Sequence, residues 1–243
     1  MTIKNAMVLA AGLGTRLRPI TDRVPKPLVP VGGKPMIDYA LDSLAEAGVR
    51  RAVVNVHHFA EQMEAHLAAY SRLDITISDE RDHLMNSGGG LVKGLQHLEP
   101  GLVFVMNADL FWIGEKPGEK TNLQRLAEFF DPDRMDMALL CVPIENTTGH
   151  NGKKDFSIAE DGRLARHNGA EGNAMVYAGA IVLDTSIFLD APKDAFNLNI
   201  YFDRAIGCGR LFGLDLQGHW LTVGTPDALA EAETVLLKSA SGA

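Results

Sequence analysis

The sequence has few of the residues that define disulfide-rich, membrane-spanning or nucleic-acid-binding proteins. Its two cysteines, Cys141 and Cys208, cannot build a disulfide framework and form no CxxC pair, which is typical of a reducing compartment and gives no zinc motif. No run approaches the ~20 apolar residues of a membrane span, and the N-terminus has no basic stretch followed by an apolar one. The formal net charge of −8 argues against a broad surface for nucleic acid or anionic lipid. We therefore expect a cytoplasmic protein that binds neither nucleic acid nor membrane.

Motifs for covalent catalysis and for histidine-based metal binding are also missing. The sequence contains no Gly-x-Ser-x-Gly elbow and no catalytic-cysteine signature. His57 and His58 are adjacent, and neighbouring residues of a strand point to opposite faces, so a regular strand does not let both bind one ion. We interpret the eight histidines as structural or surface residues.

What is present is the alternating pattern of an α/β protein. Apolar segments alternate with amphipathic helical segments through the first half, which predicts βαβ units and a mainly parallel mixed sheet. The length and the 46% hydrophobic content fit one domain with a sizeable core. The expected strands are 6–10, 53–56, 75–78, 102–106, 137–142, 175–183 and 211–216, and the expected helices are 36–47, 59–69, 126–130, 199–206 and 226–238, with a hairpin turn at 161–162.

The most informative segment follows the first expected strand. It reads Leu9-Ala10-Ala11-Gly12-Leu13-Gly14-Thr15-Arg16-Leu17-Arg18-Pro19, and Pro25-Lys26-Pro27-Leu28 comes shortly after. The glycines allow backbone N–H groups to turn toward a phosphate, and Arg16 and Lys26 supply cations. No Gly-Lys-Ser/Thr follows, so this is not a P-loop, and Arg18-Pro19 interrupts the helix that a dinucleotide fingerprint needs. The segment therefore predicts a site for a nucleoside triphosphate.

Two further segments are expected at the same crevice. Asn107-Ala108-Asp109 ends the strand 102–106, and ligands of open α/β sheets bind at that edge. Asn86-Ser87-Gly88-Gly89-Gly90 precedes an apolar helical pattern, so its N–H groups would face a ligand at a helix N-terminus.

The glycine-rich segment resembles the signature of the sugar-1-phosphate nucleotidyltransferase family, Leu-x-x-Gly-x-Gly-Thr-Arg-Leu-x-Pro followed by Pro-Lys-Pro-Leu. The resemblance implies a three-layer Rossmann-like fold and a Mg²⁺-dependent reaction between a nucleoside triphosphate and a sugar 1-phosphate. It implies one domain over 1–243, with a nucleotide-binding half at about 1–110, a sugar-binding half at about 111–225 and a C-terminal helix at 226–238. A monomer or a homodimer fits this expectation.

The resemblance also implies residue roles. Arg16 would contact the β- and γ-phosphates, Lys26 the α-phosphate and the incoming sugar phosphate, and Asp109 the metal ion. The segment 86–90 is similar to one that contacts the base in uridylyltransferases of the family; the alternative is a helix N-terminus whose glycines serve close packing. The residues expected to bind the nucleotide are Leu9, Ala10, Ala11, Gly12, Gly14, Thr15, Arg16, Lys26, Asn86, Ser87, Gly88 and Asn107.

One departure from the family pattern concerns the second metal ligand. The family text Trp-x-Asp-Val-Gly-Thr is matched by Trp220-Leu221-Thr222-Val223-Gly224-Thr225, so a threonine stands at the acidic position. Mg²⁺ accepts one carboxylate together with phosphate oxygens and waters, and a threonine hydroxyl can hold one of those waters. We expect a weaker metal site at Asp109 and Thr222; the alternative is a catalytically impaired, nucleotide-binding sensor.

Short segments further along the chain are similar to N-acetylmuramate-1-phosphate uridylyltransferases of bacterial cell-wall recycling, which makes UTP and N-acetylmuramic acid 1-phosphate the favoured substrates. From them we predict sugar contacts by Asp155, Gly179 and Asn199. Trp112 either walls the sugar crevice or packs in the core. Mannose-1-phosphate guanylyltransferases share the glycine-rich signature and remain an alternative.

Overall fold

The computed structural model describes residues 2–169 and 173–241. Its main sheet has the strand order β11-β10-β12-β6-β1-β4-β5, with β8 and β13 extending from β12. The parallel part consists of β1 (Asn5–Leu9), β4 (Arg51–Val56), β5 (Asp74–Asp79) and β6 (Leu102–Asn107). These strands run in the same direction, so their carboxyl ends meet at one edge of the sheet.

The second half of the sheet is mainly antiparallel. It consists of β8 (Met137–Pro143), β10 (Phe156–Ile158), β11 (Leu164–Arg166), β12 (Ala174–Asp184) and β13 (Leu211–Asp215). β12 pairs antiparallel with β6, β8 and β10, whereas β13 runs parallel to β8. The expected α/β fold with a mixed sheet is confirmed, and the hairpin expected at Asp161-Gly162 joins β10 to β11.

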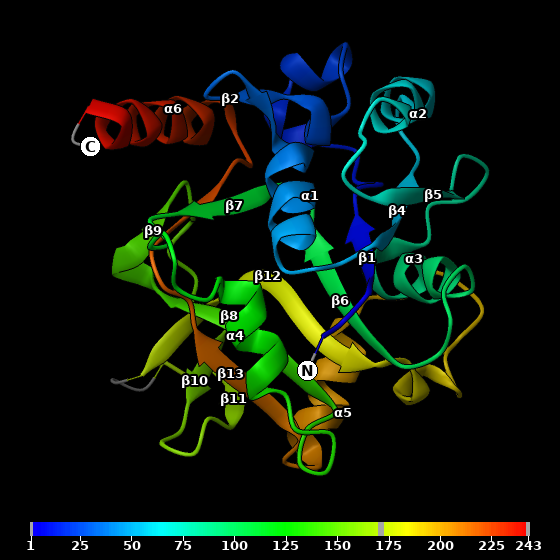
Figure 1. The fold of residues 1–243 in the computed structure, drawn as a ribbon, viewed down its shortest axis with the longest axis vertical. Coiled ribbons are helices and arrows are strands. Elements are labelled where there is room, and N and C mark those ends of the chain that lie inside the picture. Colours follow the sequence, from blue (N-terminus) through cyan, green and yellow to red (C-terminus); the bar gives the residue numbers. More distant parts are fainter. Residues whose placement is uncertain (1, 170–172, 242–243) are drawn as a thin grey trace.

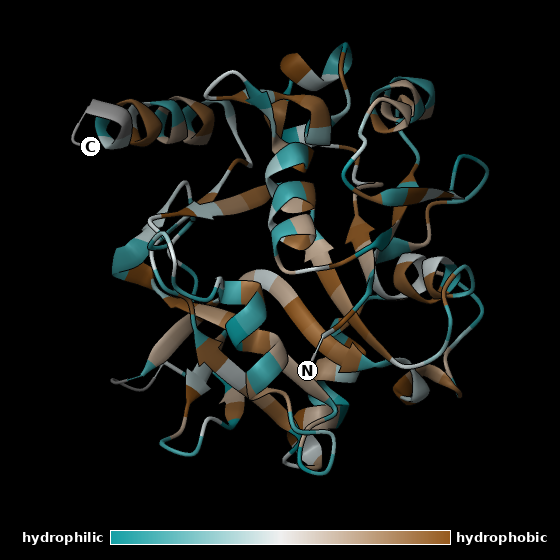
Figure 2. Cartoon of the chain, in the orientation of Figure 1, coloured by the Kyte–Doolittle hydropathy of each residue, from teal (hydrophilic) through white to brown (hydrophobic). Residues whose placement is uncertain are grey.

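Helices cover both faces of the sheet and give three layers. The helices are α1 (Met36–Glu46), α2 (Ala60–Ala68), α3 (Asn86–Leu95), α4 (Asn122–Phe129), α5 (Asn199–Gly207) and α6 (Pro226–Ser241). Because successive side chains of a strand point to opposite faces, the sheet separates two apolar clusters. Ala6 and Val8 face α1, α2 and α4, whereas Met7 faces α3 and α5. The strands at the centre are correspondingly apolar, while α1 carries apolar and polar residues in turn (Figure 2).

A smaller sheet lies beside the main one, and the sequence did not predict it. It has the order β7-β14-β9, from β7 (Leu110–Ile113), β14 (His219–Thr222) and β9 (Thr147–Thr148). The short strands β2 (Pro30–Val31) and β3 (Lys34–Pro35) pair with each other. α6 packs against this region and lies near β2, away from the centre of the main sheet (Figure 1).

Within the part of the chain that the structure describes, no helix is both long enough and apolar enough to cross a membrane.

Candidate active site

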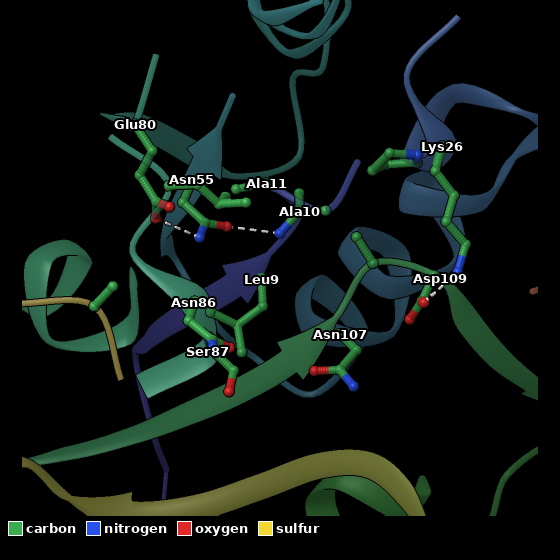
Figure 3. A pocket seen from close by; sticks show the side chains of 15 residues that line it. Leu9, Ala10, Ala11, Lys26, Asn55, Glu80, Asn86, Ser87, Asn107 and Asp109 are labelled. Carbon is green, nitrogen blue, oxygen red and sulfur yellow. Dashed lines mark hydrogen bonds and ion pairs between the residues drawn. The ribbon is translucent and has the colours of Figure 1, made fainter. Parts of the chain in front are cut away.

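A cavity of about 540 Å³, here called the first cavity, lies at the carboxyl edge of the parallel strands. Each parallel strand contributes to it at or just after its end: Leu9 on β1 and Ala10 directly after it, Asn55 on β4, Glu80 after β5 and Asn107 on β6. The start of α3 closes one side (Figure 3). The lining residues are Leu9, Ala10, Ala11, Gly12, Lys26, Pro27, Asn55, Glu80, Leu84, Asn86, Ser87, Asn107, Ala108, Asp109 and Ala195.

An ion pair occupies one end of the first cavity. The Lys26 ammonium lies 2.5 Å from the Asp109 carboxylate, and the two side chains are 11% and 36% exposed. Asp109 follows β6, and Lys26 opens a short 3₁₀ turn (Lys26–Leu28) after the glycine-rich segment. The structure therefore brings together two residues that the sequence assigned to phosphate and metal binding.

A buried polar pair occupies the other end of the first cavity, opposite Lys26 and Asp109 (Figure 3). The Asn55 side chain accepts a hydrogen bond from the Ala10 N–H at 2.6 Å and donates one to Glu80 at 2.7 Å. Glu80 also accepts from the Met85 N–H at 3.0 Å. This pair was not predicted from the sequence. The signal was a lone asparagine in the apolar run Val-Val-Asn-Val and an acidic residue directly after the next strand.

The start of α3 forms one wall of the first cavity. Asn86 has a φ of 60° and its side-chain oxygen accepts from the Ser87 N–H. The Ser87 hydroxyl accepts from the Leu198 N–H at 3.0 Å, which ties α3 to the segment before α5. Asn86 and Ser87 line the first cavity, whereas Gly88 packs against the Phe196 ring, where a Cβ would lie 2.3 Å from a ring carbon.

A second cavity of about 230 Å³ adjoins the first, because Leu9, Ser87 and Asn107 line both. Asp155 and Asn199, both predicted sugar contacts, line it. The Asp155 carboxylate accepts from the Tyr177 N–H at 3.0 Å. The remaining lining residues are Phe156, Arg166, Tyr177, Asn197, Leu198 and Phe202. Phe156, Tyr177, Asn197 and Leu198 belong to the short segments that carry the resemblance, whereas Arg166 and Phe202 lie outside them and were missed from the sequence.

Arg166 is the cation among the described residues that line the second cavity. Its guanidinium donates to the Asp203 carboxylate at 2.7 Å and to the Asn199 side-chain oxygen at 2.8 Å. It also lies over the Phe156 ring at 4.9 Å from the centroid. These contacts orient the guanidinium while its side chain stays 38% exposed.

Two predicted sugar contacts lie outside both cavities. Trp112 is 7% exposed on β7 and packs in the core between the sheet and α1. Leu110 and Trp112 face that core and Phe111 faces the opposite cluster, as alternation along a strand requires. Of the two alternatives given for Trp112, the sugar crevice and the core, the structure shows packing in the core. Gly179 has a φ of 76° at an irregularity in β12, and a Cβ there would lie 2.1 Å from a Leu110 methyl carbon, so it serves packing.

Arg16 and Thr222 meet in a third cavity, of about 380 Å³, between the glycine-rich segment and the start of α6. Arg16 lies beside Gly224, where its guanidinium nitrogen would be 3.4 Å from an added Cβ. His150 lines this cavity too, and burial lowers the pKa of its imidazole. Gly14 and Thr15 follow Gly12, which lines the first cavity, and precede Arg16, which lines the third, but they line neither cavity themselves. The Gly14 carbonyl accepts a hydrogen bond from the Thr21 hydroxyl.

The metal site predicted at Asp109 and Thr222 is divided in this geometry. The backbones are adjacent, because the Val223 N–H donates to the Asp109 carbonyl at 3.3 Å. The side chains, however, line different cavities. In the described ranges no three His, Cys, Asp or Glu side chains converge as a metal cluster. One carboxylate facing a cavity still fits a Mg²⁺ ion that arrives with phosphate oxygens and keeps most of its waters.

A glycine-rich loop and a lysine–aspartate pair thus lie at the carboxyl edge of the parallel strands, which is where open α/β sheets bind their ligands. The nucleotidyl transferase family model matches residues 5–239, and the chain belongs to this family.

Two curated relatives cover almost the whole chain. The sequence is 40% identical over 240 residues to the N-acetylmuramate alpha-1-phosphate uridylyltransferase of Caulobacter vibrioides, covering 97% of this chain and 98% of that one. It is 29% identical to the mannose-1-phosphate guanyltransferase of Yarrowia lipolytica, covering 97% of this chain and 64% of that one.

Solved structures agree on the fold. A UDP-glucose pyrophosphorylase complexed with UDP-glucose superposes with a TM-score of 0.78 at 18% identity, covering 98% of this chain and 99% of that chain. The inositol-1-phosphate CTP transferase from T. maritima superposes with a TM-score of 0.75 at 16% identity, covering 96% and 97%. The three-layer nucleotidyltransferase fold is therefore confirmed.

Proposed function

We propose that the protein transfers a nucleotidyl group from a nucleoside triphosphate to a sugar 1-phosphate, releasing pyrophosphate, with UTP and N-acetylmuramic acid 1-phosphate as the favoured substrates. The observation that carries the proposal is the Lys26–Asp109 pair at one end of the first cavity, which opens into a second, polar cavity. The full-length similarity to an N-acetylmuramate alpha-1-phosphate uridylyltransferase supports the choice of substrates. The product would be a cell-wall precursor, so the reaction would serve peptidoglycan recycling in the cytoplasm.

The charges of the first cavity support one orientation of the nucleotide. The Glu80 carboxylate at one end repels phosphate oxygens, and the Lys26 ammonium at the other end attracts them. We therefore place the base and ribose between Ala10, Asn86 and Ser87, and the α-phosphate beside Lys26. The β- and γ-phosphates would then extend along Gly12 toward Arg16.

The chemistry needed from these residues is positioning and charge neutralisation. An oxygen of the sugar phosphate must approach the α-phosphorus in line with the leaving pyrophosphate, and two anions repel each other until cations lie between them. Lys26 would neutralise both phosphates, because it lines the first cavity, and that cavity shares Leu9, Ser87 and Asn107 with the second. Asp109 would hold Mg²⁺ together with the phosphates; when bound, the ion would neutralise charge on the phosphate oxygens.

The second cavity supports a charged sugar. N-acetylmuramic acid carries a lactyl carboxylate that N-acetylglucosamine lacks, and Arg166 offers a guanidinium in this cavity. Asp155 and Asn199 would accept and donate hydrogen bonds at the sugar hydroxyl groups. The lining of the two cavities supports the division into a nucleotide-binding half and a sugar-binding half, since the first cavity draws mainly on 9–109 and the second mainly on 155–202.

A nucleotide-binding sensor is the second candidate. Thr222 at the position of the family's second acidic residue favours it, because Asp109 is then the one carboxylate of the predicted metal-binding pair.

Pyrophosphate release tests the proposal. The protein is incubated with Mg²⁺ and N-acetylmuramic acid 1-phosphate, and UTP is compared with GTP, CTP, dTTP and ATP; mannose 1-phosphate then replaces the muramic sugar. Turnover with UTP and the muramic sugar is the expected result. Turnover with GTP and mannose 1-phosphate alone would move the protein to the guanylyltransferases, and nucleotide binding without pyrophosphate release would favour the sensor.

A further inference from the structure

We propose that Asn55 and Glu80 are positioning residues that lock the first residues of the glycine-rich segment to the start of α3, and so set the shape of the base and ribose end of the first cavity. The inference rests on the proposed function, because it concerns how that cavity receives its nucleotide.

The pair forms a chain of hydrogen bonds between two walls of the cavity. The Ala10 N–H donates to Asn55, Asn55 donates to Glu80, and the Met85 N–H donates to the other Glu80 oxygen. Ala10 belongs to the glycine-rich segment, and Met85 is the residue before α3. A displacement of either wall would therefore break a short hydrogen bond in this chain.

Only a side chain with one donor and one acceptor completes the middle of this chain. The Asn55 amide offers its oxygen to a backbone N–H and its nitrogen to a carboxylate, and these two partners fix its orientation. An aspartate would place two carboxylates against each other, and an apolar residue would leave the buried Ala10 N–H and one oxygen of the buried Glu80 carboxylate without their partners.

Burial makes these bonds costly to lose. Asn55 is 3% exposed and Glu80 is 1% exposed, so both side chains depend on protein partners for their hydrogen bonds. The carboxylate also lies at the N-terminus of α3, where the helix dipole favours negative charge. The third glycine of the Gly88-Gly89-Gly90 run makes room for the pair, because a Cβ on Gly90 would lie 2.5 Å from Glu80 and 2.8 Å from Asn55.

The pair is separate from the phosphate-binding end. Its hydrogen bonds in the described structure involve neither Lys26 nor Asp109, which pair with each other. Figure 3 shows the two pairs on opposite sides of the cavity. A change at Asn55 is therefore expected to act on the part of the ligand that all its phosphorylated forms share.

The test is equilibrium binding to the Asn55→Ala and Glu80→Gln variants. The probes are the nucleoside triphosphate that the wild type binds most tightly, among UTP, GTP, CTP, dTTP and ATP, and the matching nucleoside monophosphate. The triphosphate is titrated by calorimetry, and the monophosphate is measured by its displacement of the triphosphate. Glu80→Gln keeps the shape of the side chain, so it tests the pair even where Asn55→Ala lowers the yield of folded protein.

Asn122→Ala is the matched control. Asn122 is 1% exposed, and its side chain donates to the Gln217 carbonyl and accepts from the Gln217 N–H, both at 2.8 Å. The Asn122→Ala substitution therefore removes a buried asparagine that has two backbone partners but lines neither cavity.

We expect Asn55→Ala and Glu80→Gln to lower the affinity for the triphosphate about tenfold or more, and the affinity for the monophosphate by the same factor. The affinities of Asn122→Ala should match those of the wild type. A loss confined to the triphosphate would overturn the inference, since the pair would then serve the phosphates. An equal loss in Asn122→Ala, or wild-type affinity in both variants, would also overturn it. Binding is measured without a sugar phosphate, so failure of turnover is detected separately.

Discussion

At the scale of single residues, the charged side chains of the first cavity lie at its two ends, with Glu80 at one end and the Lys26–Asp109 pair at the other. Lys26 is nearly buried, and an ammonium in that position is stabilised by the Asp109 carboxylate. A phosphate entering the cavity offers Lys26 a second anionic partner, while Asp109 faces the same space. The same lysine therefore serves the free protein and the proposed complex.

Replacing Lys26 tests its role. Lys26→Ala removes a cation from the place where negative charge develops during transfer, and we expect kcat to fall roughly a hundredfold or more. Lys34→Ala is the control, because Lys34 pairs with Asp42 at the same distance of 2.5 Å but lines neither cavity. Steady-state pyrophosphate release measures both. A Lys26→Ala enzyme with near-wild-type kcat would show that the role is wrongly assigned.

Thr222 provides a second test at this scale. Thr222→Asp restores an acidic side chain beside the backbone of Asp109, and we expect the Mg²⁺ concentration for half-maximal rate to fall, because a second carboxylate attracts the ion.

The control for this change is Thr225→Asp. Thr225 lines the same third cavity, and its hydroxyl accepts from the Ala228 N–H at the start of α6, a capping role that aspartate also performs. It therefore adds the same charge with the helix cap retained. An unchanged Mg²⁺ requirement in Thr222→Asp, or an equal fall in both variants, would contradict the weakened metal site.

Sequence reasoning reached the residues that lie in a motif and missed those that only a fold brings together. Asp109 was predicted to share one crevice with the glycine-rich segment, and in the structure it forms an ion pair there with Lys26. Asn55 and Glu80 belong to no motif that was noticed, although each lies at the end of a parallel strand, so the rule that located Asp109 would also have located them. Trp112 was assigned two alternatives because β7, which fixes its direction, was not predicted.

At the scale of elements, the glycines of α3 show why this helix begins so close to its neighbours. Each glycine of the run 88–90 meets a different structure: the Phe196 ring, the backbone at 194–195 and the Asn55–Glu80 pair. The close packing brings α3 near β1 and β4, so the helix forms a wall of the first cavity. Glycine lowers the intrinsic stability of a helix, and here the contacts offset that cost.

This packing predicts the effect of a single methyl group. Gly90→Ala would push a Cβ against two buried polar side chains, and we expect the free energy of unfolding to fall by about 1–3 kcal/mol. Gly207→Ala in α5 is the control, since no heavy atom lies within 4 Å of its added Cβ, and it should gain roughly 0.5–1 kcal/mol. Urea unfolding measures both. If Gly90→Ala and the wild type had the same free energy of unfolding, the Asn55 and Glu80 side chains would be able to move aside without loss of stability, contrary to this prediction.

The elements that sequence patterns predicted are the long ones. α1 and β6 differ from their expected bounds by one residue at one end, because clear apolar periodicity marks them. β7, β9 and β14 have two to four residues each, which is too short for a period to be visible, and they exist because segments far apart in the chain pair with one another. Thr222 lies on β14, so its position relative to Asp109 required the structure.

At the scale of the whole molecule, the change from parallel to antiparallel pairing coincides with the change from the first cavity to the second. β6 is the boundary, since it pairs parallel with β1 and antiparallel with β12. Asn107 at its end lines both cavities. The two proposed substrates would therefore meet beside the strand that joins the two parts of the sheet.

If the second cavity selects the sugar by its charge, Arg166→Gln should act on one substrate alone. We expect the KM for N-acetylmuramic acid 1-phosphate to rise about tenfold or more, because the variant lacks the guanidinium that would pair with the lactyl carboxylate. The KM for UTP should stay unchanged, since Arg166 does not line the first cavity. The residual rate with N-acetylglucosamine 1-phosphate, which has no carboxylate, should also stay unchanged. Steady-state kinetics with each substrate varied in turn measures these values.

Arg163→Gln separates this effect from a general effect on the β10–β11 hairpin. Arg163 lies on the same hairpin and pairs with Asp161 at 2.7 Å, the distance that Arg166 keeps from Asp203, but it lines neither cavity. We expect its kinetics to match those of the wild type. If Arg166→Gln raised the KM for both sugar phosphates equally, the guanidinium would instead contact the phosphate or ring that they share, and sugar selection would have to come from the neutral polar groups around Asn199.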